Sequence, residues 1–155
     1  PVINYDAAIE SFQAIVDNYP YSEYEQKAQL KIADAYFDDE RYEEALAYYQ
    51  DFVESSKKFR LPTDKERAAL QDLADTLRKI PENESAEFIQ NEVFETGKRH
   101  FAKEELRQWF KALYEVLLGS EQGPRMGAFI KLYGRDNVVS LIERALAGED
   151  LGKAA

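Results

Sequence analysis

The amino-acid sequence predicts an all-α protein of about eight helices. Apolar residues recur every three or four positions, which is the helical period, and no stretch reads convincingly as a β-strand. Gly and Pro fall between the periodic stretches and separate them. The chain has 155 residues, of which 45% are hydrophobic, so it can form one domain or two very small ones. The helices are expected at about residues 4–19, 22–38, 41–57, 64–80, 85–101, 104–118, 125–133 and 137–147.

Capping residues place the ends of the first helices. Asn4 is expected to cap the first helix, and Pro20 ends it because the residue before a proline avoids the helical conformation. Ser22 and Glu25 have the spacing of a capping box, in which a side chain and a backbone N–H bond reciprocally. The second helix therefore begins directly after Ser22.

The later helices have similar signals. Thr63 and Glu66 form a second capping box at the start of the fourth helix. Gly119 is expected to end the sixth helix in the left-handed conformation that glycine adopts easily. Asp136 is expected to cap the last helix, which ends before Gly148.

The first third of the chain contains an internal repeat. Residues 5–9, Tyr-Asp-Ala-Ala-Ile, return at 42–46 as Tyr-Glu-Glu-Ala-Leu, and Phe12 returns as Tyr49. This spacing resembles a tetratricopeptide repeat. The stretches YPYSEYEQKAQLKIADAYF and YEEALAYYQDFV are similar to the repeats of bacterial outer-membrane assembly lipoproteins. The resemblance implies helical repeats over residues 1–57, and such repeats need neighbours to cover them.

The remainder, residues 58–155, resembles another family. LRQWFKALYEVLLG, GPRMGAFIKLYG and VVSLIERALAGE are similar to the C-terminal end of class I lysyl-tRNA synthetases. The resemblance implies a helical anticodon-binding module rather than a catalytic domain. It also implies that Arg125 and its loop face anticodon nucleotides, with Lys131 and Arg135 nearby as further RNA-binding candidates.

The two resemblances belong to different compartments, envelope and cytoplasm, and they meet in the helix expected at 41–57. This helix is apolar on nearly all of its faces, so we expect other helices to pack against it on two sides. We interpret it as shared by both parts, with Tyr48 turned toward the C-terminal bundle. The expected function is that of an engineered helical fusion, a structural scaffold without evolved activity. Its packing residues are Tyr42, Ala45, Leu46, Tyr48, Tyr49, Phe52 and Val53.

A binding module is the alternative function, either for tRNA on the C-terminal bundle or for a peptide or protein on the repeats. A net charge of −10, of which −8 falls in residues 1–58, predicts weak tRNA binding. Other basic candidates lie at the end of the fifth helix and the start of the sixth, at Lys98, Arg99, Lys103 and Arg107. The expected state is a monomer or a homodimer.

Catalytic chemistry is not expected. The nucleotide-binding signatures of class I synthetases and the glycine-rich phosphate loop are missing, so we expect no enzymatic activity. No motif in the sequence positions the single histidine, His100, as part of a catalytic triad. Its place at a helix C-terminus is one where a cation is favoured. Without cysteine, no metal site is expected, and no cofactor is expected either. No stretch is long and apolar enough to predict a membrane helix.

Overall fold

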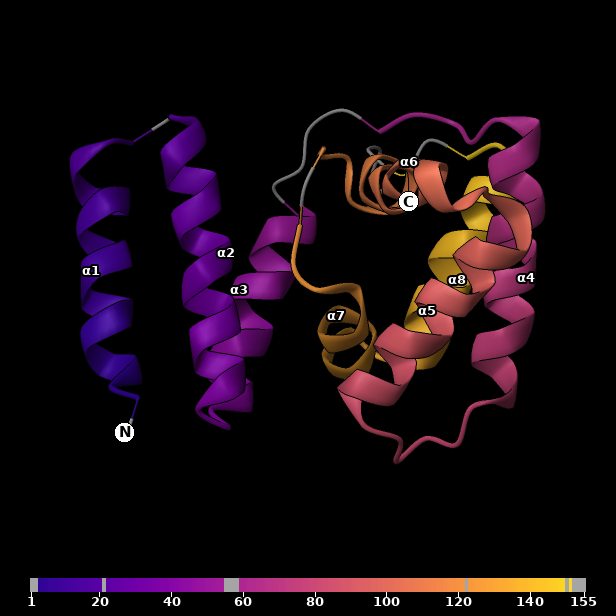
Figure 1. Cartoon of the computed structure of the whole chain (residues 1–155). Coiled ribbons are helices and arrows are strands. Elements are labelled where there is room, and N and C mark those ends of the chain that lie inside the picture. Colours follow the sequence, from indigo (N-terminus) through magenta and orange to yellow (C-terminus); the bar gives the residue numbers. More distant parts are fainter. Residues whose placement is uncertain (1–2, 21, 55–58, 122, 150, 152–155) are drawn as a thin grey trace. The chain divides into compact units, whose positions relative to one another are not determined.

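The computed structural model describes residues 3–20, 22–54, 59–121, 123–149 and 151, with the backbone alone for 51–54. Among these residues there are helices and no strands, which confirms the predicted all-α class (Figure 1). Two compact units divide the chain, Pro1–Phe52 and Val53–Ala155, here called unit 1 and unit 2. The α-helices are α1 Tyr5–Asn18, α2 Glu23–Asp38, α3 Tyr42–Glu54, α4 Asp64–Lys79, α5 Ala86–His100, α6 Leu106–Leu113, α7 Met126–Tyr133 and α8 Arg135–Leu146.

Unit 1 consists of α1, α2 and α3. The side chains of Asn4 and Ser22 accept hydrogen bonds from the first turns of α1 and α2, so both predicted N-caps are confirmed. Figure 1 shows α1 and α2 side by side. The fully buried side chains of this unit lie on α2 and α3 and include Ile32 and Tyr49, whereas α1 has no buried residue.

Tyr48 of α3 contacts the repeat helices rather than facing away from them. Its ring lies 5.7 Å from the ring of Tyr36 on α2, and its hydroxyl donates to Gln13 Oε1 on α1 at 3.5 Å. These contacts belong to unit 1, and the expectation that Tyr48 also meets the C-terminal bundle stays a prediction.

The other residues assigned to the shared helix differ in burial. Ala45 and Tyr49 are completely buried, Leu46 is half-buried and Tyr42 is exposed. The side chains of Phe52 and Val53 and the predicted helical residues 55–57 lie outside the described part. The boundary between the units falls within the last turn of α3. A helix that belongs to both units stays a prediction.

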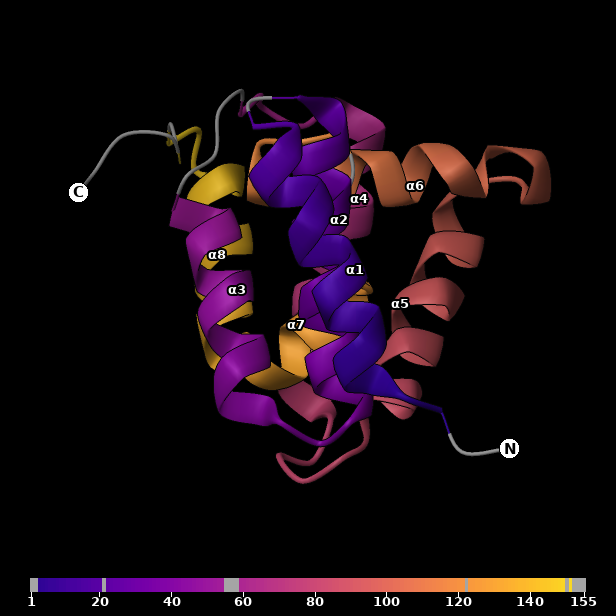
Figure 2. The ribbon, with the colours of Figure 1, turned by 90° about the vertical axis from the view of Figure 1, so that its left-hand side faces the viewer.

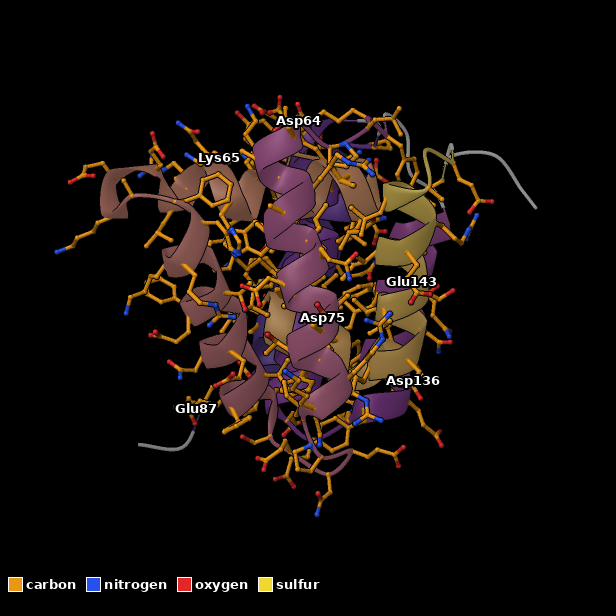
Figure 3. All side chains as sticks on the ribbon, turned by 90° about the vertical axis from the view of Figure 1, so that its right-hand side faces the viewer. Asp64, Lys65, Asp75, Glu87, Asp136 and Glu143 are labelled. Carbon is orange, nitrogen blue, oxygen red and sulfur yellow. The ribbon has the colours of Figure 1, made fainter. Side chains whose placement is uncertain are left out.

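Unit 2 contains α4 to α8, and Trp109 is the largest side chain in its core. Trp109 is completely buried, and its Nε1–H donates to the backbone oxygen of Val93 on α5 at 3.0 Å. Gly97 makes this possible, because a Cβ atom there would lie 2.3 Å from Cδ1 of the indole. Figure 3 shows α4 between α5 and α8, and it contacts both of them.

Two predicted boundaries in unit 2 differ from the structure. The sixth helix begins as a 3-10 turn at Lys103–Glu105, continues as α6 and ends as a π turn at Tyr114–Leu118. Three consecutive side chains of the π turn, Val116 to Leu118, are buried. The predicted left-handed Gly119 follows, with φ of 67°.

Asp136 does not cap α8, and that prediction is wrong. Gly134, with φ of 111°, turns the chain directly from α7 into α8, so the helix begins one residue before Asp136. The Asp136 carboxylate pairs with Arg135 instead, at 3.2 Å. The capping box of Thr63 and Glu66 at α4 is confirmed in both of its hydrogen bonds.

Candidate nucleic-acid interface

Lys131 and Arg135, two of the predicted RNA-binding residues, come together on the loop between α4 and α5. Lys131 Nζ donates to the backbone oxygen of Glu84 at 2.6 Å, and Arg135 donates to the backbone oxygen of Ile80. Arg135 also lies 3.4 Å from the carboxylate of Glu82. Both cations therefore hold the loop in place, and their role in RNA binding stays a prediction.

Arg125, the third predicted residue, lies at the other end of α7. It occupies the N-cap position of this helix, and its side chain is exposed. Pro124 before it is buried and accepts a hydrogen bond from the hydroxyl of Tyr114 at 3.0 Å. Gly127 after it packs against α5, where a Cβ atom would lie 2.2 Å from the backbone oxygen of Ala86. The exposed arginine is thus anchored on both sides by buried backbone.

Helices α5 and α6, which adjoin in Figure 2, together carry exposed aromatic and basic residues. Phe94 of α5 is 40% exposed, and its ring lies 6.3 Å from that of Phe110 on α6. Lys98 Nζ lies 5.7 Å from the centre of the Phe94 ring and 2.9 Å from the Glu95 carboxylate. An exposed aromatic ring flanked by cations suits the stacking of an unpaired base.

The exposed side of α6 adds cations to this surface. Arg107 and Lys111 are exposed and one helical turn apart, and Arg107 lies one turn from Phe110. Neither cation has an ion pair within the described residues, and neither has Lys103 in the preceding 3-10 turn. We call Phe94, Lys98, Arg107, Phe110 and Lys111 the α5–α6 surface. The sequence analysis did not identify Phe94, Phe110 and Lys111. For Lys111 a signal exists, because its four-residue spacing from Arg107 places the two cations side by side on one helix.

The other basic candidates at this end of α5 are already bound. Arg99 donates to both carboxylate oxygens of Asp72 on α4, at 2.8 and 2.9 Å, and His100 Nε2 lies 2.8 Å from the same carboxylate. The hydrogen bonds from Arg99 first, and then from His100, lower the pKa of Asp72 to about 2. The cluster therefore ties α5 to α4, and it leaves Arg99 little capacity for a phosphate.

One hollow of unit 2 lies between the start of α4 and the end of α8. It measures about 270 Å³, and its lining includes Phe59, Arg60, Leu61 and Ala145. Arg60 donates to both oxygens of Glu66 at 2.8 Å and to Glu115 at 3.3 Å. Because these bonds occupy the guanidinium, the hollow offers no free cation to an anionic ligand.

The described part of the chain has no cluster of ligating side chains that suits a metal ion, and none of its helices is long and apolar enough to span a membrane. The Asp72 carboxylate beside His100 also pairs with Arg99, so among the described residues the contacts of His100 link α5 to α4.

Comparison with known proteins finds likeness to two families. Residues 3–60 match the model of a family described as outer membrane lipoprotein, YfiO. The lysine–tRNA ligase of Roseobacter denitrificans is 49% identical over 105 residues, 68% of this chain and 20% of the ligase. That of Rickettsia bellii is 45% identical over 102 residues, 66% of this chain and 19% of the ligase. That of Rickettsia felis is 40% identical over 125 residues, 81% of this chain and 23% of the ligase.

No solved structure matches the chain. The chain spans about a fifth of the length of these ligases. A match that covers 125 of 155 residues must include residues 31–125, so it extends into the segment that matches the lipoprotein model. The N-terminal likeness to lipoprotein repeats and the C-terminal likeness to lysyl-tRNA synthetases are both confirmed.

The prediction of an engineered scaffold is wrong. It depended on two resemblances that do not occur together, whereas the likeness to a ligase continues across α3 and into the repeat segment. The comparisons show that the chain is similar to lysine–tRNA ligases over part of their length. The comparisons do not support the expectation of no enzymatic activity. The relatives are named as ligases, and they are matched over only part of their length.

Proposed function

We propose that unit 2 binds tRNA as a helical module of a synthetase-related protein. The observation that carries the proposal is the 49% identity over 105 residues to a lysine–tRNA ligase. The shared region is about a fifth of that enzyme, and this chain has no glycine-rich phosphate loop within its sequence. A role in holding tRNA therefore fits the matched region better than a role in forming an adenylate.

The α5–α6 surface is the contact that we propose for the RNA. Phe94 offers an exposed ring on which an unpaired base stacks, and Arg107 and Lys111 offer cations that have no ion pair in the described structure. Protein contacts to single-stranded RNA commonly combine aromatic stacking with basic side chains that approach phosphates. Arg125 is a separate candidate, at the N-cap of α7.

The charge of the chain makes the proposed binding weak. Phosphate contacts supply most of the affinity of nucleic-acid complexes, and the net charge of −10 repels RNA at long range. We expect a dissociation constant of roughly 10⁻⁴–10⁻⁶ M at physiological salt.

Filter binding of a lysine tRNA transcript to the whole chain, at several salt concentrations, tests the proposal. The double variant Arg107→Ala and Lys111→Ala should bind more weakly, and its plot of log affinity against log salt should be shallower by about 0.7–0.9 per lost phosphate contact. Lys31→Ala is the matched control, because Lys31 is also an exposed helical lysine without an ion pair among the described residues, and it lies in unit 1.

Phe94→Ala separates stacking from charge. It should cost about 1–3 kcal/mol of binding free energy without changing the salt slope, since stacking on an aromatic ring releases no counterions. Equal affinities and slopes for the double variant and Lys31→Ala would contradict the proposed surface. Binding that Arg125→Ala abolishes, with the α5–α6 variants unchanged, would transfer the site to the start of α7.

A further inference from the structure

A hollow of unit 2 that the proposed RNA contact does not use lies between the end of α4 and the facing side of α5. It measures about 320 Å³, which is within the range of sites that hold small molecules. Of its described lining residues, four lie around the end of α4 and three lie on α5, and none belongs to the α5–α6 surface. Figure 3 shows the two helices side by side. The chemistry of these lining residues determines what the hollow can bind.

The part of the hollow near the loop between α4 and α5 is apolar. Its lining there consists of Ile80, Pro81 and Phe88. The Phe88 side chain is 41% exposed and Pro81 is exposed as well, whereas Ile80 is buried. One exposed aromatic ring on a surface is ordinary, but a ring that lines a hollow with other apolar residues gives a ligand apolar contact on several sides. This part of the hollow therefore suits an aromatic group.

The rest of the lining carries two opposite charges that have no ion pair within the described residues. Lys79, the last residue of α4, is exposed, and Glu92, one turn after Phe88 on α5, is half-buried. Arg99 also lines the hollow, but Asp72 binds it through both carboxylate oxygens. The hollow therefore offers one available ammonium group and one available carboxylate. The hollow beside Arg60 differs, because its guanidinium is bound to Glu66.

The end of α4 makes the hollow more favourable for a positively charged group. The backbone N–H of Ile80 donates to the oxygen of Leu77 at 3.2 Å, so it does not supply the bond that the oxygen of Thr76 receives in a continuing helix. Thr76 lines the hollow. The last carbonyl groups of a helix also carry partial negative charge. Together with Glu92, they favour an ammonium group on a ligand.

We propose that this hollow binds a free α-amino acid with an aromatic side chain. The ring of the ligand lies against Phe88, its carboxylate pairs with Lys79 and its ammonium group pairs with Glu92. A nucleotide fits less well, because its phosphate brings more negative charge than Lys79 alone balances and places it near Glu92. An aromatic acid or an aromatic amine fits less well too, since each leaves one of the two charges unpaired. This site is separate from the proposed RNA contact and does not depend on it.

Three ligands with the same phenylethyl skeleton and different charges test the proposal. The whole chain is titrated, without RNA, with L-phenylalanine, with 3-phenylpropionate, which lacks the ammonium group, and with 2-phenylethylamine, which lacks the carboxylate. Shifts of the backbone amide NMR signals give each dissociation constant. For L-phenylalanine we expect a value on the order of 1 mM, from the size of the ligand. The other two ligands should bind about two- to fivefold more weakly, because a partly exposed ion pair contributes modestly.

Two charge variants give the decisive comparison. Lys79→Gln should weaken L-phenylalanine and 3-phenylpropionate about two- to fivefold and leave 2-phenylethylamine as tight as before or tighter. Glu92→Gln should weaken L-phenylalanine and 2-phenylethylamine by a similar factor, whereas 3-phenylpropionate should gain affinity because a repulsion is removed. A folding defect does not produce such opposite changes. Glu87→Gln is the matched control, since Glu87 is an exposed glutamate of α5 outside the lining (Figure 3), and it should leave all three ligands unchanged.

Phe88→Ala should weaken all three ligands alike, by about two- to tenfold, because it removes the aromatic contact and neither charge. If no ligand gives saturable shifts at about 20 mM, well above the expected dissociation constant, the proposal is wrong. Equal affinities for 2-phenylethylamine and L-phenylalanine would overturn it in favour of a peptide N-terminus, which brings an ammonium group without a neighbouring carboxylate. Adenosine monophosphate that binds more tightly than L-phenylalanine, and loses this affinity in Phe88→Ala, would overturn it in favour of a nucleotide.

Discussion

Unit 1 and unit 2 differ in how completely their helices are covered. Every α-helix of unit 2 has buried residues, and its core contains large side chains such as Trp109, Phe129 and Leu73 that are completely buried. In unit 1, α1 has none, although it packs along α2. A bundle closes on itself, whereas a helix taken from a repeat has two faces that need neighbours.

The ion pair with the least exposed carboxylate among the described residues lies in unit 2. In unit 2, Arg60 binds Glu66, whose side chain is only 9% exposed, and hydrogen bonds from Arg60 lower the pKa of Glu66. In unit 1, Arg41 pairs with Asp6, whose side chain is 80% exposed. Exposed pairs contribute little to stability because water and salt screen them. We therefore expect unit 2 to hold most of the folding free energy of the chain.

Of the tests of this expectation, separating the two units should give the largest effect. A fragment of residues 1–58 should lose most of its helical circular dichroism, since a chain this short buries too little apolar surface to fold reliably. In the intact chain, denaturant unfolding followed by helicity and by Trp109 fluorescence should give coincident transitions, because the predicted shared helix couples the units. A well-folded fragment, or two separate transitions, would show that the units are independent.

Removing the central side chain of unit 2 should give the next largest effect. Trp109→Ala deletes a completely buried indole and leaves a cavity, so it should cost about 3–5 kcal/mol of unfolding free energy. Urea unfolding monitored by circular dichroism measures this loss, since the fluorescent residue is gone. Phe12→Ala in α1 should cost clearly less, because that ring is only half-buried. Equal losses at both positions would mean that the two units are packed alike.

Gly97→Ala should have an intermediate effect. The added Cβ would lie 2.3 Å from Cδ1 and 2.8 Å from Nε1 of Trp109, and overpacking of this kind costs about 1–3 kcal/mol. In an ordinary helix the same change would be stabilising, so the sign of the effect is diagnostic. Trp109→Ala removes both atoms that clash, and in that background Gly97→Ala should cost less. Additive losses, measured by urea unfolding of the four proteins, would rule out this contact.

The fold was predictable from sequence because local signals and the helical period agree. The N-caps Asn4 and Ser22, the capping box of Thr63 and Glu66, and the left-handed Gly119 all occur as predicted. The helix after His100 was less predictable. The sequence predicts one continuous helix over residues 104–118, and the 3-10 turn at its start and the π turn at its end have no local signal comparable to a cap.

The candidate site was harder to predict because a cation in the sequence does not show which partner it finds. Lys131 and Arg135 reach backbone oxygens more than 40 residues away, and Arg99 finds Asp72 on the neighbouring helix. Arg107 and Lys111 find no ion pair among the described residues, so they remain available at the surface. The packing of α5 on α4, and of α7 and α8 against the loop between α4 and α5, distinguishes the basic residues that are bound from those that remain available.

The smallest effect concerns the ion pairs themselves. Asp72 is held by Arg99 and His100, and its pKa is lowered from 3.8 to about 2. A carboxyl whose pKa is lower in the folded state than in the unfolded state stabilises the fold above the unfolded pKa, and this stabilisation disappears as the pH falls toward 2. With allowance for partial exposure, Asp72→Asn should cost about 1 kcal/mol at pH 7.

That difference should shrink between pH 4 and pH 2 as the wild-type carboxyl is protonated. Asp6→Asn in unit 1 is the matched control, because Asp6 also joins two helices through an arginine but lies in water. It should change the unfolding free energy very little at either pH. Urea unfolding of the wild type, Asp72→Asn and Asp6→Asn at pH 7, 4 and 2 measures how much unfolding free energy each substitution costs. If the Asp72→Asn loss does not depend on pH, the carboxylate contributes by packing and not by charge.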